Sequence, residues 1–335
     1  MHTNSISLTD LNTFGLEISA SELIEINSEK TLLENLAYIR SQKFLILGGG
    51  SNLLFTKNFD GLIVLNRIKG IKLLKKLENE FIVEVGAGEL WHDFVLFSLK
   101  NNWFGLENLS LIPGTVGATP IQNIGAYGVE IVDVLDSVDF IDIETGKLHT
   151  LSNKECMFGY RESIFKNELK GTFIITKVRF KLETLPNLKL EYGAIKETLK
   201  EREISNPTPK DVSDAVIYIR STKLPNPKEI GNCGSFFKNP LVSVSLFNQL
   251  KIKYPLIPSF YVDENHVKIP AAWLIDQLGW KGKTIGKIGV HKNQALVLVN
   301  YGGGSGEEIK NLAYKIIESV HTAYGILLTP EVNIV

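Results

Sequence analysis

A run without any charged side chain extends from Leu109 to Val129 and is rich in glycine. Its glycines, Gly114, Gly117, Gly125 and Gly128, leave the backbone open to close approach by a ligand. Backbone N–H groups in loops of this kind bind pyrophosphate well. A single glycine-rich segment is more often a plain buried loop between strands, so other segments must decide between the two interpretations.

Two further glycine segments favour a dinucleotide site. Phe44–Leu47 is a short apolar run typical of a buried strand, and a glycine turn follows at 48–52. Glu80–Val85 alternates like a strand and leads into a second turn at 86–88. A Rossmann arrangement is excluded, because the next strand-like run, Leu62–Leu65, leaves no room for a crossover helix. The three segments together therefore predict a different nucleotide-binding architecture.

Composition narrows the classes of partner. The chain has 335 residues, 44% of them hydrophobic, which is enough for two or three domains with substantial cores. Because 36 Lys and Arg balance 37 Asp and Glu, no overall field attracts nucleic acid or an anionic membrane. Met1–Asp10 carries no Lys or Arg, and no stretch has the length and apolarity of a spanning helix, so neither secretion nor membrane insertion is expected.

The cysteines point to a reducing compartment. Cys156 and Cys233 are the only two, too few for a secreted disulfide framework and without the paired spacing of a zinc site. We therefore expect a cytoplasmic protein without a metal. Cys233 is better explained as a small buried side chain than as a nucleophile, since no histidine is close in sequence. His291 is more simply structural than a base or ligand.

Periodicity places the other elements. Apolar residues from Leu90 to Leu99 recur at helical spacing, and alternation predicts strands at Val134–Ile143 and Thr172–Leu182. These strands flank Tyr160-Arg161, so Arg161 is expected on a loop carried by a rigid sheet. Pro207–Pro227 contains four prolines and is a candidate domain boundary.

The C-terminal part alternates helices and strands. Ala271–Leu278 is predicted to be a helix, Ala295–Val299 a buried strand and Glu307–Tyr324 a long amphipathic helix. Ser305 and Glu308 form the pattern of a capping box, and Gly325 supplies a C-terminal stop.

Six motifs, in their order and spacing, resemble the UDP-N-acetylenolpyruvoylglucosamine reductase family over nearly the whole chain. Tyr192 before Gly193 further resembles the form of this family that carries an extra tyrosine loop over the substrate. The six motifs lie at Leu47–Leu54, Ile112–Gly117, Pro120–Gly128, Phe158–Arg161, Gly234–Pro240 and Pro330–Val332.

The resemblance implies an α+β fold. Residues 14–184 would form an FAD-binding domain of the vanillyl-alcohol-oxidase (PCMH) type with two α/β subdomains, and residues 205–335 an α+β substrate domain. FAD would be held non-covalently, since neither cysteine lies in the glycine segments. NADPH would reduce FAD, and the reduced flavin would saturate the enolpyruvyl ether of a UDP-sugar to give UDP-N-acetylmuramate for peptidoglycan. A monomer is expected. The implied FAD contacts are Gly48, Gly49, Gly50, Ser51, Asn52, Pro113, Gly114, Gly117, Thr119, Gly125, Ala126 and Tyr127.

The same resemblance implies three catalytic residues. Hydride addition to the enolpyruvyl methylene leaves an enolate of the carboxylate, which preorganised cations or donors must stabilise. Arg161 suits this role because a guanidinium stays protonated and binds carboxylates bidentately, and Glu331 would help to hold the carboxylate. Ser235 is the implied proton donor. Without the resemblance, each residue has a simpler interpretation. Arg161 would form a salt bridge with Glu162, Glu331 would be a solvated acid near the C-terminus, and Ser235 would be a turn residue.

The resemblance also implies the contacts of the UDP-sugar. Tyr192, Lys223 and Asn239 would contact its diphosphate and uridine, with Gln294 nearby. Where many relatives have a tyrosine that closes over the substrate, this chain has Phe260 followed by Tyr261, so Tyr261 is the candidate to supply that hydroxyl.

Two other functions compete with this one. A flavin oxidase or dehydrogenase of the same fold would act on a different small substrate, and its reduced flavin would not be reoxidised by the UDP-sugar. A non-catalytic nucleotide sensor would bind nucleotide without NADPH-dependent bleaching of a flavin.

Overall fold

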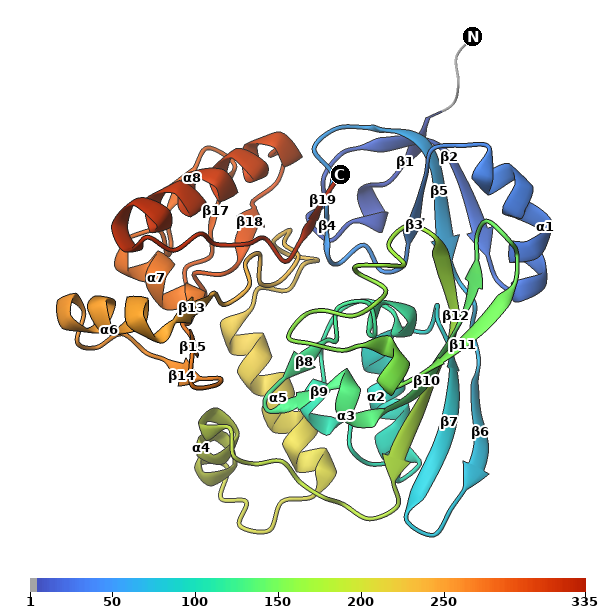
Figure 1. Cartoon of the computed structure of the whole chain (residues 1–335), viewed down its shortest axis with the longest axis horizontal. Helices are drawn as coiled ribbons and strands as arrows, with labels where there is room; N and C mark the ends of the chain where they lie inside the picture. Colours follow the sequence, from blue (N-terminus) through green and yellow to red (C-terminus); the bar gives the residue numbers. More distant parts are fainter. Residues whose placement is uncertain (1–4) are drawn as a thin grey trace. The chain divides into compact units, whose positions relative to one another are not determined.

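A computed structural model describes residues 5–335, and it divides into two compact units (Figure 1). Unit 1 comprises Ala20–Gly49 and Asp60–Thr222, with the described residues before Ser7. Unit 2 comprises Ser7–Ser19, Gly50–Phe59 and Lys223–Val335. The chain therefore contributes two early segments to the unit that holds its C-terminal third. The contiguous domain bounds expected from the sequence, 14–184 and 205–335, stay a prediction.

The first sheet of unit 1 carries the predicted strand Phe44–Leu47, observed as β3 with the same bounds. β3 pairs in parallel with β5, from Phe44 opposite Leu62 to Leu47 opposite Leu65. The connection between them, residues 48–58, holds only the short β4 and no helix, which agrees with the exclusion of a Rossmann crossover. The sheet order is β1-β2-β5-β3. The elements here are β1 (Ile6–Ser7), β2 (Ser19–Ile26), α1 (Glu29–Arg40), β3 (Phe44–Leu47) and β5 (Phe59–Asn66). The strand β4 (Leu53–Leu54) in the connection belongs to unit 2.

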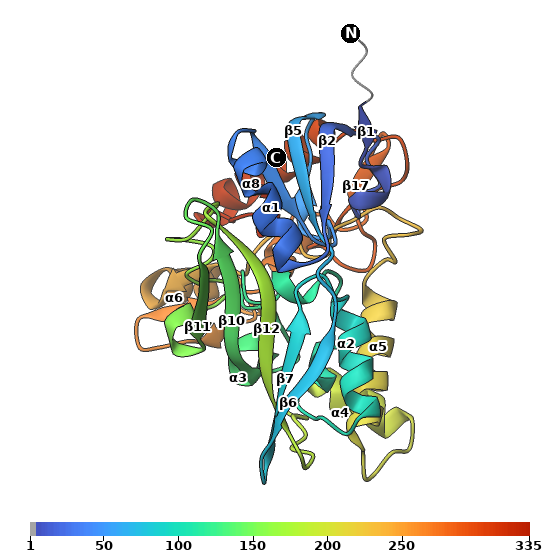
Figure 2. The same cartoon turned by 90° about the vertical axis from the view of Figure 1, so that its right-hand side faces the viewer.

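The second sheet of unit 1 has the antiparallel order β11-β10-β12-β7-β6 (Figure 2). Helix α2 buries Trp91, Phe94 and Val95 in the core of this sheet, as the helical spacing predicted. The two strands predicted on either side of Arg161 are β10 and β12, and Arg161 lies on the loop between β11 and β12. The elements are β6 (Ile71–Lys76), β7 (Glu80–Gly86), α2 (Trp91–Lys100), β10 (Leu135–Asp142), β11 (Leu148–Ser152) and β12 (Phe173–Glu183).

The proline-rich stretch Pro207–Pro227 is mostly helical. Its prolines stand at the two ends of α5, where a missing N–H costs little at the start and a proline after the end stops the helix. The division between the two units falls at the last turn of this helix, between Thr222 and Lys223. The remaining elements of unit 1 are β8 (Gly125–Ala126), β9 (Val129–Glu130), α3 (Ile131–Val134), α4 (Gly193–Glu201) and α5 (Pro209–Lys223), with short 3-10 turns η2 (Glu107–Leu109), η3 (Val116–Ala118) and η4 (Lys154–Cys156).

Unit 2 has its own apolar core, and α8 packs over β17 and β18 (Figure 1). The predicted caps of α8 are confirmed, since Ser305 and Glu308 form a capping box and Gly325 ends the helix at φ 67°. The predicted strand Ala295–Val299 forms only from Leu298, because the amides of Val297 and Leu296 bond back to Gln294 in a turn. The elements are η1 (Thr9–Leu11), β13 (Leu241–Ser243), α6 (Val244–Lys253), β14 (Phe260–Tyr261), β15 (His266–Lys268), α7 (Ala271–Gln277), β16 (Thr284–Ile285), β17 (Ile288–Val290), β18 (Leu298–Asn300), α8 (Gly306–Tyr324) and β19 (Asn333–Ile334), which pairs in parallel with β4.

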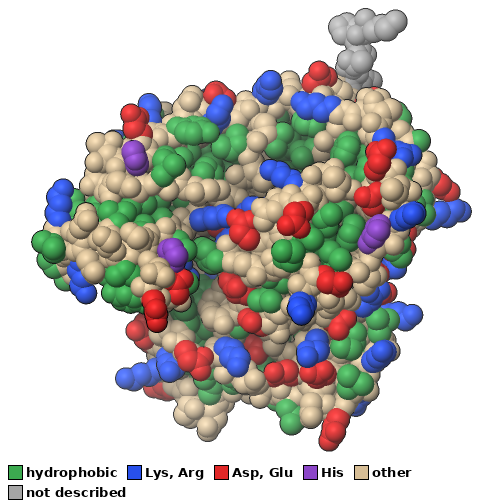
Figure 3. All heavy atoms as spheres, in the orientation of Figure 1, with side chains coloured by type: hydrophobic (Ala, Val, Ile, Leu, Met, Phe, Trp, Pro, Cys, Tyr) green, Lys and Arg blue, Asp and Glu red, His purple; other side chains and the backbone are tan. Residues whose placement is uncertain are grey.

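The surface shows acidic and basic side chains interspersed over the face drawn in Figure 3, as expected from a net charge of −1. Among residues 5–335, no helix combines the length and apolarity needed to cross a membrane. The same residues contain no cluster of three or more His, Cys, Asp or Glu side chains that could hold a metal ion.

Candidate active site

Three glycine segments converge in unit 1. A Cβ on Gly48 would lie 2.5 Å from Thr115 Oγ1, and a Cβ on Gly49 would lie 2.9 Å from Gly114 Cα. A Cβ on Gly117 would lie 2.6 Å from the Cβ of Ala87, whose carbonyl accepts the Gly117 amide at 2.8 Å. Since real Cβ contacts are not this short, glycine is what permits the three segments to pack together. Gly48 and Gly49, the turn at 86–88 and the turn at 113–117 therefore pack together within unit 1.

This structure presents amide donors that the protein itself does not use. Among residues 5–335, the backbone N–H groups of Gly49, Gly114 and Thr115 donate to no other group. The amides of Gly50 and Ser51, next along the chain, have no partner there either. Loops with several unpaired N–H groups bind phosphate oxygens. The unpaired amides of Gly49, Gly114 and Thr115 in unit 1 therefore fit the pyrophosphate of a dinucleotide such as FAD.

The other predicted FAD contacts have varied surroundings. The Thr119 hydroxyl is buried and donates to the Val116 carbonyl at 2.8 Å, so it stabilises its own turn. Pro113 is exposed, and Gly125 and Ala126 form β8, the partner of β9. In unit 2, the Asn52 side-chain amide donates to the Glu331 carbonyl at 3.3 Å.

Arg161 is held in place by its neighbours. Its guanidinium donates to the carbonyls of Asn123 at 3.3 Å and Gly125 at 2.7 Å, and it lies 3.7 Å from the Glu130 carboxylate. The Arg161 side chain is only 19% exposed, and its guanidinium carbon lies 5.5 Å from the centre of the Tyr160 ring. These contacts preorganise a cation beside β8, one of the predicted cofactor segments.

Three of the seven non-glycine residues with positive φ among residues 5–335 lie in these segments. Asn123 has φ 43°, Tyr127 φ 52° and Arg161 φ 56°. Such conformations cost about 1–3 kcal/mol each and persist only where the surrounding structure enforces them. Glu130 and the Gly159 carbonyl enforce the turn at Asn123, whose side-chain amide donates to them at 2.9 and 3.1 Å.

Tyr127 and Tyr192 form an aromatic pair, with ring centres 5.1 Å apart in an edge-to-face arrangement. Burial raises the pKa of the Tyr127 hydroxyl, although the nearby Arg220 lowers it. Tyr192 precedes α4 and is 51% exposed. A predicted cofactor residue and a predicted substrate residue are thus in contact within unit 1.

Ser235 and Glu331 lie in unit 2 on adjacent segments. The Glu331 amide donates to the Phe236 carbonyl at 2.8 Å, and Phe237 is paired with Pro330. Ser235 is exposed, while Phe236 and Phe237 behind it are buried. Its hydroxyl makes no hydrogen bond within residues 5–335. The buried neighbours therefore leave the Ser235 hydroxyl exposed to solvent.

The predicted substrate residues of unit 2 differ in availability. Lys223 ends α5 and is exposed, whereas the Asn239 side-chain oxygen accepts the Ala271 amide at 2.9 Å at the start of α7. Gln294 is half-buried, and its side-chain oxygen accepts the Leu296 amide. Phe260 and Tyr261 are both exposed on β14. The centre of the Tyr261 ring lies 6.0 Å from the centre of the Phe247 ring.

Both cysteines are buried and unsuited to reaction. Burial raises the pKa of the Cys156 thiol to about 12 and that of Cys233 well above its usual value. Since the thiolate is the nucleophile, neither is activated. His291 is buried as well, and its ring nitrogen accepts the Asn293 amide at 3.4 Å. These observations support structural roles for all three.

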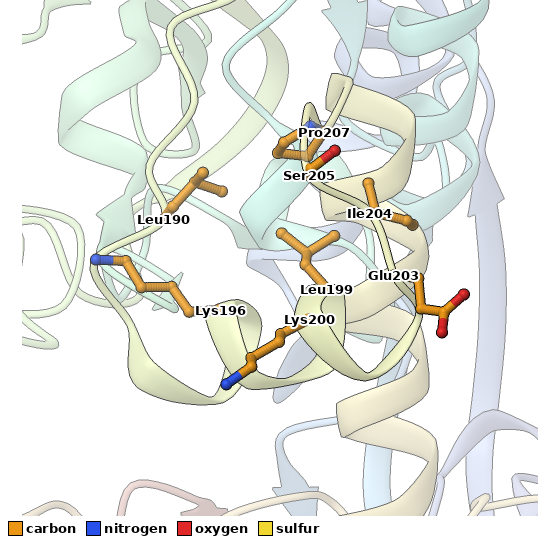
Figure 4. A pocket seen from close by; sticks show the side chains of 8 residues that line it. All are labelled: Leu190, Lys196, Leu199, Lys200, Glu203, Ile204, Ser205 and Pro207. Carbon is orange, nitrogen blue, oxygen red and sulfur yellow. The ribbon is translucent and has the colours of Figure 1, made fainter.

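A cavity of about 350 Å³ lies beside α4 (Figure 4). Its walls are mainly apolar, and the charged ends of Lys200 and Glu203 point to opposite sides. None of the predicted site residues lines it. The lining residues are Leu190, Lys196, Leu199, Lys200, Glu203, Ile204, Ser205 and Pro207.

Comparisons with known proteins agree with this geometry. A family model described as "FAD binding domain" matches residues 21–152, and one described as "UDP-N-acetylenolpyruvoylglucosamine reductase, C-terminal domain" matches residues 226–335. A UDP-N-acetylenolpyruvoylglucosamine reductase from Flavobacterium johnsoniae is 51% identical over 99% of both chains. The chain belongs to this reductase family. A second member, from Amoebophilus asiaticus, is 47% identical over 99% of this chain and 98% of its own.

Membership makes the protein an enzyme, an oxidoreductase with an FAD-binding domain. The crystal structure of the reductase (MurB) from Thermus caldophilus matches with a TM-score of 0.69 at 24% identity, covering 100% of this chain and 99% of that one. The fold predicted from the sequence, α+β with an FAD-binding domain of the vanillyl-alcohol-oxidase type, is confirmed.

Two residues of this family member escaped the sequence analysis. Glu130 pairs with Arg161, and Asn108 is a buried amide with two carbonyl partners. Glu130 carried a signal, since it is the first charged residue after the uncharged run. Asn108 carried none, because its partners lie 19 and 81 residues away.

Gly49→Ala is expected to weaken FAD binding by about tenfold to a hundredfold. This factor corresponds to the loss of one charge-assisted hydrogen bond from a displaced backbone amide. The added Cβ would push against Gly114 Cα, a backbone atom that cannot turn aside as a side chain can. Fluorescence titration of the apoprotein with FAD measures the effect. Gly193→Ala is the matched control, because its Cβ would meet nothing within 4 Å. Equal FAD affinity in wild type and Gly49→Ala would contradict the assignment of this loop.

Proposed function

We propose that this protein reduces UDP-N-acetylglucosamine enolpyruvate to UDP-N-acetylmuramate with NADPH as the reductant. The observation that carries the proposal is the full-length likeness to relatives named as this reductase. The unpaired amides of Gly49, Gly114 and Thr115, in two of the glycine turns, support the cofactor part, because they suit a pyrophosphate. The step would supply peptidoglycan synthesis in the cytoplasm, and we propose that the enzyme acts there as a monomer.

When bound, FAD supplies the two-electron chemistry that links oxidation of NADPH to saturation of the enolpyruvyl group. The residues that would hold it are those of the turns at 48–52 and 113–119 and of the segment 125–127. Their backbone donors would bind its phosphates and leave no need for a covalent bond.

Arg161 binds and stabilises the substrate carboxylate as negative charge develops on it. The carbonyls of Asn123 and Gly125 already fix the guanidinium, so little reorganisation is required during reaction. Glu331 helps to orient the carboxylate.

Ser235 donates a proton to the carbon next to the carboxylate, which is the enolate carbon. An ordinary serine is a weak acid, but the carbon that it protonates is strongly basic. The alkoxide left behind recovers its proton from water, to which Ser235 is exposed. The nucleotide part of the UDP-sugar is bound by five residues, of which Tyr192 lies in the extra tyrosine loop. The others are Lys223, Asn239, Gln294 and Tyr261.

The purified protein should absorb as a flavoprotein, lose that absorbance on anaerobic addition of NADPH, and regain it when the UDP-sugar is added. Replacing NADPH by NADH in the same cuvette tests the choice of reductant. A reduced flavin that oxygen reoxidises but the UDP-sugar does not would favour a same-fold oxidase of another substrate. A protein that binds nucleotide without any bleaching would be a sensor.

Non-covalent binding predicts that acid or heat releases all of the yellow chromophore. Both cysteines are buried with raised pKa values, so neither offers a thiolate for a covalent link. After precipitation with acid, flavin absorbance should be found in the supernatant. A pellet that stays yellow would disprove non-covalent attachment.

A further inference from the structure

Asn108 connects two segments that lie far apart in the sequence. It is 1% exposed and belongs to η2, within the loop that leads to the Pro113 turn. Its side-chain NH2 donates to the Tyr127 carbonyl at 2.8 Å and to the Lys189 carbonyl at 2.9 Å. Both hydrogens of one amide group are thus used to join the segment 125–128 to the start of the segment 188–192.

The Tyr127 carbonyl belongs to a residue with an unusual backbone conformation. Tyr127 has φ 52°, and such a conformation requires outside contacts to persist. The Asn108 hydrogen bond is one such contact. It fixes the peptide between Tyr127 and Gly128, next to two residues that are predicted to contact the flavin, Ala126 and Tyr127.

The Lys189 carbonyl belongs to the segment that precedes Tyr192. Leu188 and Leu190, on either side of Lys189, pack with Tyr127 on an apolar cluster made by α4 and α5. The rings of Tyr127 and Tyr192 touch at 5.1 Å. The Asn108 bonds, the shared cluster and the ring pair all join the same two segments.

We propose that Asn108 is a positioning residue that fixes the segment 188–192 against the segment 125–128. Substrate affinity, through Tyr192, and flavin affinity, through Ala126 and Tyr127, are coupled by this residue. The part that concerns substrate rests on the proposed function, whereas the part that concerns the two segments does not.

Asn108→Ala is expected to raise KM for the UDP-sugar about tenfold and to weaken FAD binding by a similar factor, because the carbonyls of Tyr127 and Lys189 lose their shared donor. The rate of flavin reduction by NADPH should remain within about twofold of wild type. Asn108→Ser retains one donor and should give intermediate values, which keeps the proposal testable if the alanine variant folds poorly.

Asn153→Ala is the matched control. The Asn153 side-chain amide also donates to two carbonyls of unit 1, those of Val132 at 2.7 Å and Leu135 at 2.8 Å, but it touches neither segment. It should lower the melting temperature without changing KM. If the two variants raise KM equally, Asn108 has only a general structural role.

A double-mutant cycle with Tyr192→Ala shows whether Asn108 acts through Tyr192. Once Tyr192 is removed, Asn108→Ala should raise KM by less than twofold further, because interacting residues are not additive. Fully additive effects would overturn the coupling.

Hydrogen exchange in the substrate-free protein tests the positioning independently of the reaction. Amides of α4 should exchange about tenfold faster in Asn108→Ala than in Asn153→Ala. If exchange is faster but the UDP-sugar is not turned over, the proposed function fails and the positioning stands. If exchange is unchanged, the positioning fails.

Discussion

Ser235→Ala should leave the reduction of FAD by NADPH near the wild-type rate and slow reoxidation by the UDP-sugar by about a hundredfold to ten-thousandfold. Reduction by NADPH needs no proton at the substrate carbon, whereas completion of the second half-reaction does. The buried rings of Phe236 and Phe237 hold the segment on one side, and the Asn232 side chain accepts the Gly234 amide on the other. Alanine disturbs neither, so FAD content should be unchanged.

Anaerobic stopped-flow absorbance follows the two half-reactions separately. Ser245→Ala is the control, because Ser245 is an exposed serine of α6 with no assigned role. If both half-reactions slow together in Ser235→Ala, the serine supports the flavin site instead of the proton transfer. If neither slows, water or another group donates the proton.

Local patterns predicted the elements best. The strand Phe44–Leu47 and the caps of α8 at Ser305 and Gly325 were found where the sequence placed them. In each case the signal lies within a few neighbouring residues: an apolar run before glycine, a capping pair, or a glycine that can adopt positive φ. The helix at Trp91–Lys100 follows from its spacing in the same way.

Local patterns could not predict which segments of the chain belong to which unit. Residues 50–59 follow a strand of unit 1 but belong to unit 2, where β4 pairs with β19 at the other end of the chain. A pairing between strands so far apart in the sequence leaves no periodic pattern of apolar residues, since β4 has only two residues. Compact units can therefore be assembled from separate segments that a linear division of the sequence would not group.

The candidate site shows the same contrast. Glycine turns could be recognised because only glycine permits backbones to approach as Gly49 and Gly114 do. The left-handed conformations of Tyr127 and Arg161 could not, because tertiary contacts impose them on residues that disfavour them. The sequence thus indicated the candidate segments, and the structure shows how Glu130 holds two of them through Asn123 and Arg161.

Arg161→Lys should lower kcat by about a hundredfold, the effect of losing one preorganised donor to a developing oxyanion, and change KM for the UDP-sugar much less. The guanidinium donates to the carbonyls of Asn123 and Gly125 while it lies beside Glu130. A lysine keeps the charge, but its single ammonium cannot hold both carbonyls and grip a carboxylate with a planar fork. The lost interaction strengthens as charge develops, so its absence raises the barrier more than it weakens binding.

Steady-state kinetics with varied UDP-sugar give both constants for Arg161→Lys. Arg179→Lys is the matched control, because Arg179 also makes paired contacts, with Asp139 on β10 and Glu84 on β7, but lies in the sheet away from the loop that carries Arg161. It should reduce thermal stability and leave kcat unchanged. Arg161→Lys should retain FAD, since its charge and most of its volume are preserved. An unchanged kcat with a raised KM would show that Arg161 binds the substrate and transition state equally, which would remove it from the chemical step.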